Sequence, residues 1–429
     1  MNHLSKARGG GTSRRGAGFM RHVRRGLLLA SLACLLLRPA AAIEPISDPD
    51  LATTGMSRVG PLYFRPYILI RDAGYDDNIR FDAKRAQGDT TVTAVPGLRG
   101  LLLAGTRGGV TVSQELGFVA FQRNSELNHW NDSTRARGVL LLGRAALSLE
   151  ERYDSILERP NTEVDQRLRR LGNAVTGDVR TLSSGRLGLR AFVRTERIDY
   201  LSSDSITGQI ARRLNRQEET LAVIGEARVL PKTSLTLEST LGRVNFDDRN
   251  LDRDSRTRSL LPGLRFDPAA SIQGELRIGL TQLDAVQRSG GGYSGAVGDG
   301  HLSTRLGHFG RAKVGFSRAL VFSTEPGNLF FIGTSWSTAY EQFFSPRASV
   351  EALYGHGLNR YPAPDVRPSQ PSAGTGRDDR TLTYQGTFRY RMNPRVTLTL
   401  YAQRFIRNST LDSLDRDRDF YGFGSAYDF

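Results

Sequence analysis

One feature constrains the fold of this chain more than any other: apolar and polar residues alternate with period two in segment after segment. The clearest examples are residues 186–194, 272–281, 381–391 and 396–403. Because successive side chains of a strand point to opposite faces, each segment predicts a β-strand with one apolar and one polar face. No sustained helical periodicity follows the first 42 residues, so the pattern predicts an all-β protein.

The connections between these segments come in two lengths that alternate along the chain. Short turns such as 183–185 and 393–394 separate longer polar loops such as 73–88 and 201–214. This alternation is typical of a transmembrane β-barrel, whose turns lie at one end and loops at the other. The alternative is a soluble β-sandwich, which needs a packed core between its sheets. Nearly every strand here has a polar face and only 38% of the residues are hydrophobic, so we expect a closed barrel around water.

Dividing the chain at its turns predicts 18 strands. They cover residues 61–72, 90–104, 107–121, 132–143, 146–158, 164–182, 186–200, 216–229, 233–246, 254–266, 271–285, 299–307, 311–323, 328–343, 347–360, 380–392, 395–407 and 417–429. The fourth and fifth are separated at 143–145 because short turns and long loops then alternate throughout. The predicted fold is an antiparallel up-and-down barrel with an even strand number and both chain ends on one side. A count of 16 is the alternative.

The first 42 residues differ from the rest. They contain eight Lys or Arg and no acidic residue, then the apolar run 27–37, then Pro39 and three alanines that end at Ala42. A basic segment, a short apolar segment and a small-residue cleavage site predict a secretory signal peptide over residues 1–42. Its translation could start at Met1 or Met20. Residues 43–60 would then form a short periplasmic leader, and residues 61–429 the barrel.

Removing the signal peptide changes the charge of the chain. Lys and Arg fall from 59 to 51 against 44 Asp and Glu, so the net charge falls from +15 to about +7. Nucleic acid is therefore not an expected partner. The single cysteine, Cys34, would be removed as well, which excludes disulfides and thiolate chemistry from the mature chain. A lipoprotein anchor at Cys34 is a weaker alternative, because Ser31 stands where such signals favour leucine.

The end of the chain carries four aromatic residues on one face of its last strand: Tyr421, Phe423, Tyr427 and Phe429. The opposite face is mostly small, with Gly422 and Gly424. A last strand that stops on an aromatic residue resembles the closing strand of bacterial outer-membrane barrels, where it is the signal read by the barrel-assembly machinery. The resemblance implies that the rings face lipid in an interfacial girdle and that this strand closes the barrel against residues 61–72.

The polar faces of the strands carry charges of both signs, which we expect to line the lumen. The predicted lumen-lining residues are Arg186, Arg190, Arg194, Glu238, Glu275, Arg277, Lys313, Arg389 and Arg391. Their arginine excess favours an anionic substrate. The alternative is that these charges only hydrate the lumen and pair across strands. The proline-rich loop 360–379 is the expected constriction or lid.

Catalytic and metal-binding motifs are missing from the sequence. The four histidines beyond the signal peptide, at 129, 301, 308 and 356, lie outside any G-x-S-x-G or H-E-x-x-H context. Two loops, 247–254 and 412–419, alternate acid and base and could bind Ca²⁺ or lipopolysaccharide phosphates, although internal pairing is the simpler interpretation. We expect no enzyme, no cofactor and no metal site.

A short motif follows the first predicted strand: Gly74, Tyr75, Asp76, Asp77 and Asn78. Together with the Pro-led strand before it, the motif resembles the outer-membrane family named putative β-barrel porin 2. Members are associated with exopolysaccharide or capsule assembly proteins. The Asp and Asn side chains look like a loop cap that bonds backbone groups.

The resemblance implies an outer-membrane channel that exports an exopolysaccharide or a capsule-type polymer. Its expected partners are outer-membrane lipid and lipopolysaccharide, the barrel-assembly machinery, and periplasmic polysaccharide export or co-polymerase proteins. Two alternatives stay open at this point. One is a passive diffusion porin for small anionic solutes, and the other is a structural outer-membrane barrel.

Overall fold

The computed structural model describes residues 51–181, 186–202, 205–286, 292–325, 328–362 and 377–429. The chain divides into Met1–Glu44, which lies outside the described residues, and Pro45–Phe429, which contains every strand. The predicted signal peptide therefore stays a prediction.

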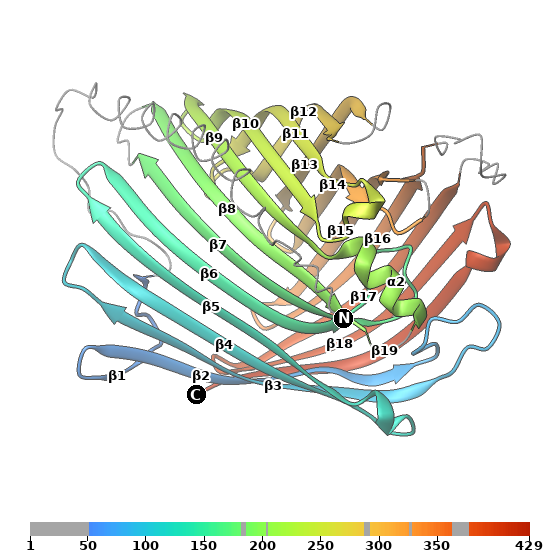
Figure 1. The fold of residues 1–429 in the computed structure, drawn as a ribbon. Helices are drawn as coiled ribbons and strands as arrows, with labels where there is room; N and C mark the ends of the chain where they lie inside the picture. Colours follow the sequence, from blue (N-terminus) through green and yellow to red (C-terminus); the bar gives the residue numbers. More distant parts are fainter. Residues whose placement is uncertain (1–50, 182–185, 203–204, 287–291, 326–327, 363–376) are drawn as a thin grey trace, which may run out of the picture. The chain divides into compact units, whose positions relative to one another are not determined.

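A single antiparallel sheet closes on itself (Figure 1). Eighteen strands, β2 to β19, each pair with the next along the chain, and β19 pairs with β2. Their bounds are β2 Leu62–Asp76, β3 Asp89–Leu103, β4 Gly108–Phe121, β5 His129–Leu142, β6 Ala145–Glu158, β7 Leu168–Thr181, β8 Leu187–Leu201, β9 Arg216–Leu230, β10 Thr233–Phe246, β11 Ser255–Phe266, β12 Ile272–Ala285, β13 Tyr293–Leu306, β14 Gly310–Phe322, β15 Phe330–Ser345, β16 Ala348–Arg360, β17 Asp378–Asn393, β18 Val396–Ser409 and β19 Arg416–Asp428.

The two faces of the closed sheet differ as the period-two pattern requires. In β10, Leu237 and Leu241 on the outer face are 51% and 44% exposed, whereas Ser234 and Thr236 on the inner face are each 7% exposed. Inner side chains are crowded by the concave wall, and outer ones are not. A band of exposed leucine and valine around the sheet would be unfavourable in water, but it suits contact with lipid.

The predicted strand count of 18 is confirmed, and the alternative of 16 is wrong. Separation of the fourth and fifth strands is also correct, because β5 ends at Leu142 and β6 begins at Ala145. The barrel begins and ends on the side of the short turns, where Asp428 of β19 is paired with Tyr67 of β2. The long loops all lie at the opposite end.

Several predicted strand limits are wrong. β13 begins at Tyr293 rather than at 299, because its glycines serve close packing and not a loop: a Cβ at Gly298 would lie 2.6 Å from the carbonyl oxygen of Arg277. β7 begins at Leu168 rather than at 164. β2 continues to Asp76, so the first three residues of the Gly74–Asn78 motif are in a strand and not in a loop cap.

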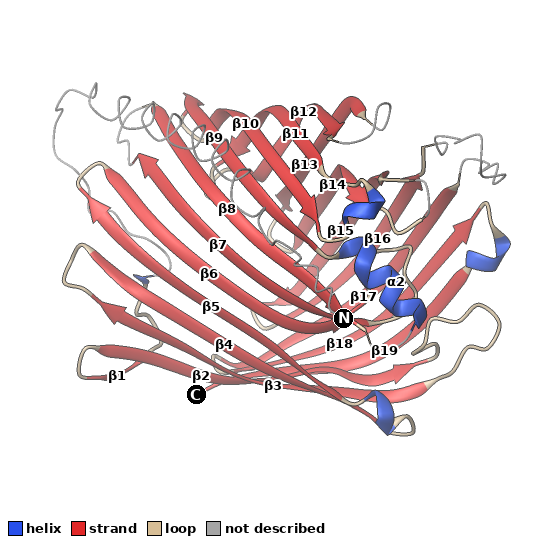
Figure 2. Cartoon of the chain, in the orientation of Figure 1, coloured by secondary structure: helices blue, strands red, loops and turns tan. Residues whose placement is uncertain are grey.

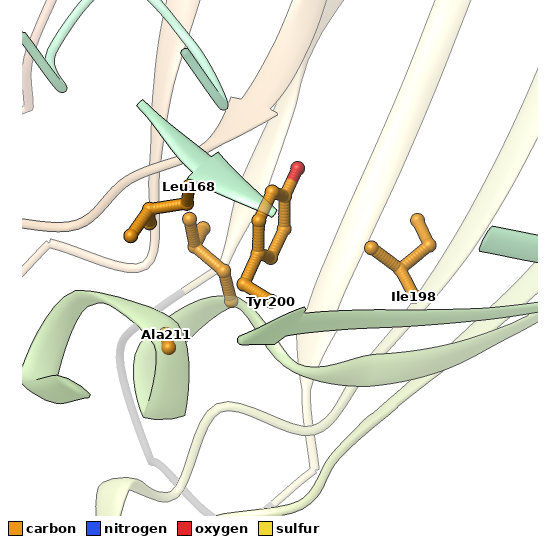
Figure 3. Close-up of a cluster of buried hydrophobic side chains, with 5 residues drawn as sticks. Leu168, Ile198, Tyr200 and Ala211 are labelled. Carbon is orange, nitrogen blue, oxygen red and sulfur yellow. The ribbon is translucent and has the colours of Figure 1, made fainter. Parts of the chain in front are cut away.

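The predicted all-β fold is confirmed, and helices are a minor part of it (Figure 2). The loop between β8 and β9 contains α2, Ser205–Leu214, and three 3₁₀ turns lie in other long loops: η2 Ser125–Leu127, η3 Arg249–Leu251 and η4 Asp412–Leu414. The helix packs on the inner wall in a cluster of buried residues (Figure 3): Leu168, Ile198, Tyr200, Ala211 and Leu214. The apolar residues of this helix do follow a helical period, but ten residues are too short a stretch for that period to stand out among the strands. Across the described residues, no helix is both long enough and apolar enough to cross a bilayer.

The residues before β2 contact the barrel at its short-turn end. β1, Ser57–Val59, pairs with the start of β2. Leu51 packs against a buried cluster of Val139, Leu141 and Ala146 on the inner wall. The part of the predicted leader that is described is therefore held against the sheet.

Candidate functional site

The loop between β6 and β7, residues 159–167, crosses the lumen at the long-loop end. It leaves the wall at β6 and forms hydrogen bonds with the turn that follows β14, and with β16 and β18. β6 and β14 are eight strands apart in the ring of 18, so the loop reaches a wall almost opposite its own. A chain segment in this position narrows the path through the barrel.

One anchor of this loop is Glu163. Its carboxylate accepts hydrogen bonds from Oγ of Ser323 at 2.5 Å, and from the backbone N and Oγ1 of Thr324 at 2.6 and 3.0 Å. Burial raises the pKa of Glu163 above its usual value, and the nearby Glu325 adds to the rise, while the three hydrogen bonds oppose it.

The second anchor is Asp165, which joins two arginines of the far wall. Its two carboxylate oxygens accept from Arg407 at 2.8 Å and from Arg416 at 2.6 Å. Arg407 is 1% exposed and also donates to the carbonyl oxygen of Thr162. A guanidinium buried this deeply needs its partners, because an unpaired buried charge is strongly unfavourable.

Other long loops join the same network. Arg253, in the β10–β11 loop, donates to the carbonyl oxygens of Arg213 at the end of α2, and of Ser323 and Leu329 in the β14–β15 connection. Arg213 in turn donates to the carbonyl oxygen of Thr324. Four loops from different parts of the ring are thereby bonded together over the mouth of the barrel.

The predicted lumen charges on β10, β12 and β17 come together in two ion-pair clusters. Arg277 contacts Glu238 at 2.6 Å, Asp299 at 2.9 Å and Glu275 at 3.7 Å. In the other cluster, Arg389 and Lys313 contact two carboxylates on β15 and β16, Glu341 and Glu351. For these residues the geometry matches the interpretation that lumen charges pair across strands.

The predicted lumen arginines on β8 and at the turns are placed differently. Arg190 pairs with Asp178 of β7, and Arg194 pairs with Glu196 at 2.7 Å. Arg186 lies in the turn before β8 and Arg391 near the end of β17, both exposed. Neither has a carboxylate partner within the described part of the chain.

Two hollows open into the inner wall, and both carry more arginine than carboxylate. One, of about 330 Å³, lies between β5 and β11 and includes four arginines and two acids: Arg137, Arg180, Arg190, Arg265, Asp178 and Glu226. The other, of about 430 Å³, lies beneath the β6–β7 loop and contains three arginines and two acids: Arg71, Arg167, Arg418, Asp72 and Asp76. We call the second one the sub-loop cavity.

The Gly74–Asn78 motif holds the seam where the barrel closes. Asp76 accepts from both Nε and Nη2 of Arg418 in β19, at 2.9 and 2.7 Å. Asp77 exchanges two hydrogen bonds with Asp419, one from its own backbone N and one to its Oδ1. Asn78 donates to the carbonyl oxygen of Asp417 at 3.0 Å. The predicted bonding to backbone groups is thus present for Asp77 and Asn78, and its partners lie across the seam.

The last strand places its two faces as the alternation indicates. Tyr421, Tyr427 and Phe429 are 57%, 38% and 53% exposed on the outer face. Gly422 and Gly424 share the inner face. The strand is paired with residues 67–76 of β2, so the seam lies against the predicted strand but is shifted along it from the predicted 61–72. The role of the rings as an assembly signal stays a prediction.

The structure tests the expectation for the acid–base loops but not the expected constriction at 360–379. Residues 363–376 lie outside the described residues, so that expectation stays untested. In the two acid–base loops, carboxylates bond within the protein: Asp254 accepts from the backbone N of Phe246, and Asp415 from that of Ser409.

Sequence patterns missed the β6–β7 loop because it is short and contains no glycine and only one proline, Pro160.

Comparison with solved structures finds other barrels at low identity. OpdK from Pseudomonas aeruginosa is 14% identical, with 85% of this chain and 98% of that chain covered and a TM-score of 0.49. OccAB3 from Acinetobacter baumannii is 11% identical, covering 85% and 99%, at 0.48. The siderophore receptor PirA from Pseudomonas aeruginosa is 12% identical, covering 85% and 80%, at 0.41. These likenesses are too distant to support an inference about substrates.

No curated protein matches the chain. The family model described as Putative beta-barrel porin 2 matches residues 48–424, which is most of the sequence. That span includes the Gly74–Asn78 motif, the loop across the lumen and all but the last residues of the closing strand. The chain therefore belongs to the Putative beta-barrel porin 2 family and is a porin-type β-barrel of the outer membrane.

Proposed function

We propose that this barrel is a passive diffusion porin for small anionic solutes. The observation that carries the proposal is the β6–β7 loop, which crosses the lumen and is anchored on the opposite wall by Glu163 and Asp165. A loop in that position narrows the path, which favours the passage of small solutes. Membership of a porin family also favours transport over catalysis.

The preference for anions is supported by the wall of the lumen. Both hollows contain more arginines than acids. Arginine is always charged and presents its donors in a fixed fork, so it favours carboxylates and phosphates in the path. Ion pairs in the two clusters of the wall neutralise many of the other charges, which leaves the excess concentrated near the hollows.

Export of an exopolysaccharide, the main expectation from the sequence, is the less favoured function. A long polymer would have to be threaded past the β6–β7 loop, and any displacement of that loop breaks the contacts of Asp165 with Arg407 and Arg416. Breaking a buried ion pair costs about 3–5 kcal/mol. Partners that deliver such a polymer remain a prediction.

The test is conductance of the purified, folded protein in a planar lipid bilayer under a salt gradient. We expect a steady open conductance whose reversal potential shows preference for chloride over potassium. A folded protein that conducts nothing, or that prefers cations, would contradict the proposal. In cells, deletion of the gene should leave surface and secreted polysaccharide unchanged. If the polysaccharide disappeared after the deletion, polymer export would be favoured instead.

A further inference from the structure

One arginine of the sub-loop cavity forms no ion pair among the described residues, although Asp76 lies close enough to oppose the lowering of its pKa. Arg167, the last residue of the β6–β7 loop, has no carboxylate partner among the residues that the structure describes. Arg418 of the same cavity pairs with both oxygens of Asp76, so that acid is already used. Arg71 contacts Glu115 only at 3.5 Å. The positive charge of Arg167 is therefore available to a solute.

The surroundings of Arg167 are positively charged as well. Burial and the charge of Arg418 hold the pKa of Arg167 below its usual value. Arg159, at the other end of the loop, has its pKa lowered to about 10 by burial and by the charges of Arg167 and Arg418. An anion bound between Arg167 and Arg418, which both line the cavity, would relieve the repulsion between them.

One side of the cavity is apolar. Phe121 and Phe420 are 5% and 6% exposed, and both contribute to its lining together with Val119 and Leu157. The guanidinium of Arg167 lies 5.5 Å from the centre of the Phe121 ring. A ligand that fits must therefore place a negative group at the arginine and an apolar body against the rings. A neutral sugar can stack on the rings but has no negative group to place at the arginine.

We infer that the sub-loop cavity binds a small organic acid, with its carboxylate at Arg167 and an apolar body against Phe121 and Phe420. The inference rests on the proposed function, because it names the class of anion that passes or pauses at this point of the path. The volume of about 430 Å³ accommodates an acid with a single ring. Its polar neighbours Thr93, Asn131 and Gln403 can accommodate further substituents.

Benzoate is the probe, and the measurement is isothermal titration of the purified full-length barrel in detergent. We expect saturable binding of benzoate, weaker binding of acetate because it lacks the apolar body, and no binding of neutral benzamide. Arg167→Gln should weaken benzoate binding by about tenfold or more, because a charge-assisted hydrogen bond is lost. Arg167→Lys should fall in between, since it keeps the charge but not the fork.

The matched control is Arg212→Gln, which removes the same charge from an exposed position on α2. It should bind benzoate as the unchanged protein does. Equal benzoate affinity in Arg167→Gln, or equal affinity for acetate and benzoate, would overturn the inference. Slower migration after heating on a gel shows that each variant is folded before titration.

Failure of this inference can be told apart from failure of the proposed function. A barrel that conducts chloride but does not bind benzoate overturns the acid site and leaves the porin proposal standing. A folded barrel that binds benzoate through Arg167 but conducts nothing overturns the porin proposal and supports the site.

Discussion

At the residue scale, closure of the barrel depends on the absence of a side chain at Gly74. A Cβ built there would lie 1.9 Å from the carbonyl oxygen of Tyr421 and 2.6 Å from Cα of Gly422. Both atoms belong to the backbone of β19, so the neighbour cannot rotate away. β2 and β19 approach closely because an irregularity in their pairing lies beside this residue.

We expect Gly74→Ala to open the seam. Overpacking costs about 1–3 kcal/mol, and the upper end applies because backbone must move. The measurement is the temperature at which the barrel loses its compact mobility on a gel. Gly138→Ala is the control, since a Cβ at Gly138 meets nothing within 4 Å. Equal melting of the two variants would show that the seam tolerates a side chain.

A second prediction at this scale concerns pH and Glu163. Its pKa is raised in the docked loop, so the docked state holds a proton more tightly than a free loop does. Docking therefore strengthens as pH falls through the raised pKa towards the usual carboxyl range, and weakens as pH rises again. We expect single-channel conductance to decrease on acidification within this window.

Glu163→Gln should remove this part of the pH dependence, because the amide imitates the protonated acid. Glu325 and other carboxylates titrate in the same range, so the difference between the two proteins is the informative quantity. An identical conductance–pH curve for both would exclude Glu163 as its source.

Sequence alone could identify the Gly74–Asn78 motif but not what it contacts. Asp76 and Arg418 are 342 positions apart, and only the closure of the ring brings them together. The lumen charges show a similar limit. Alternation predicts the face of Arg277, whereas its three carboxylate partners depend on strand register, which period two does not specify.

At the element scale, the β6–β7 loop is the part of the molecule that controls the path. Asp165 supplies both of its ion pairs with the far wall, to Arg407 and Arg416. Asp165→Asn would leave Arg407 buried without a carboxylate. The docked loop should be destabilised relative to the released loop by about 3–5 kcal/mol, which is enough to release it.

We expect Asp165→Asn to raise the mean single-channel conductance and to increase its fluctuations. Glu126→Gln is the matched control, because Glu126 pairs with Arg80 at an exposed site, where such pairs contribute little. Unchanged conductance in Asp165→Asn would mean that the loop does not limit the flow of ions.

The loop was not predictable as an element, for reasons that apply to α2 as well. Its turn residues Pro160 and Asn161 mark where the chain leaves β6 but not where the loop goes. Its strand-like end caused the strand at 168 to be predicted from 164. The residues that anchor it lie 160 to 251 positions away along the chain. Patterns of neighbouring residues hold no information on contacts made through the hollow centre of a ring.

At the scale of the whole molecule, the strand number was predictable because two independent patterns agree. Period two locates each strand, and the alternation of short and long connections excludes an odd number. Helix α2 and the tilt of the strands do not enter either pattern. The barrel and its strand number were therefore predictable from the sequence. The loops and the helix that occupy its long-loop end were not.

The last prediction concerns assembly of the complete barrel. The backbone N of Phe429 donates to the carbonyl oxygen of Pro66 at 3.3 Å, and its ring packs edge-on against Tyr427 at 4.7 Å. We expect deletion of Phe429 to leave unfolded protein in the periplasm. Phe429→Tyr should assemble normally, because it keeps an aromatic end. A folded but inactive barrel in the outer-membrane fraction after the deletion would contradict this.

The loop that crosses the lumen also has a mechanical consequence. A closed sheet can flatten into an ellipse without losing its ladder hydrogen bonds, so the shape of its cross-section is easily deformed. Here the ion pairs of Asp165 join the β6–β7 loop to β18 and β19, about six strands away round the ring, and so resist a change in the distance between these walls. Lateral pressure from the membrane therefore meets a stiff rim at the long-loop end and a compliant rim at the other, where the described connections are short turns.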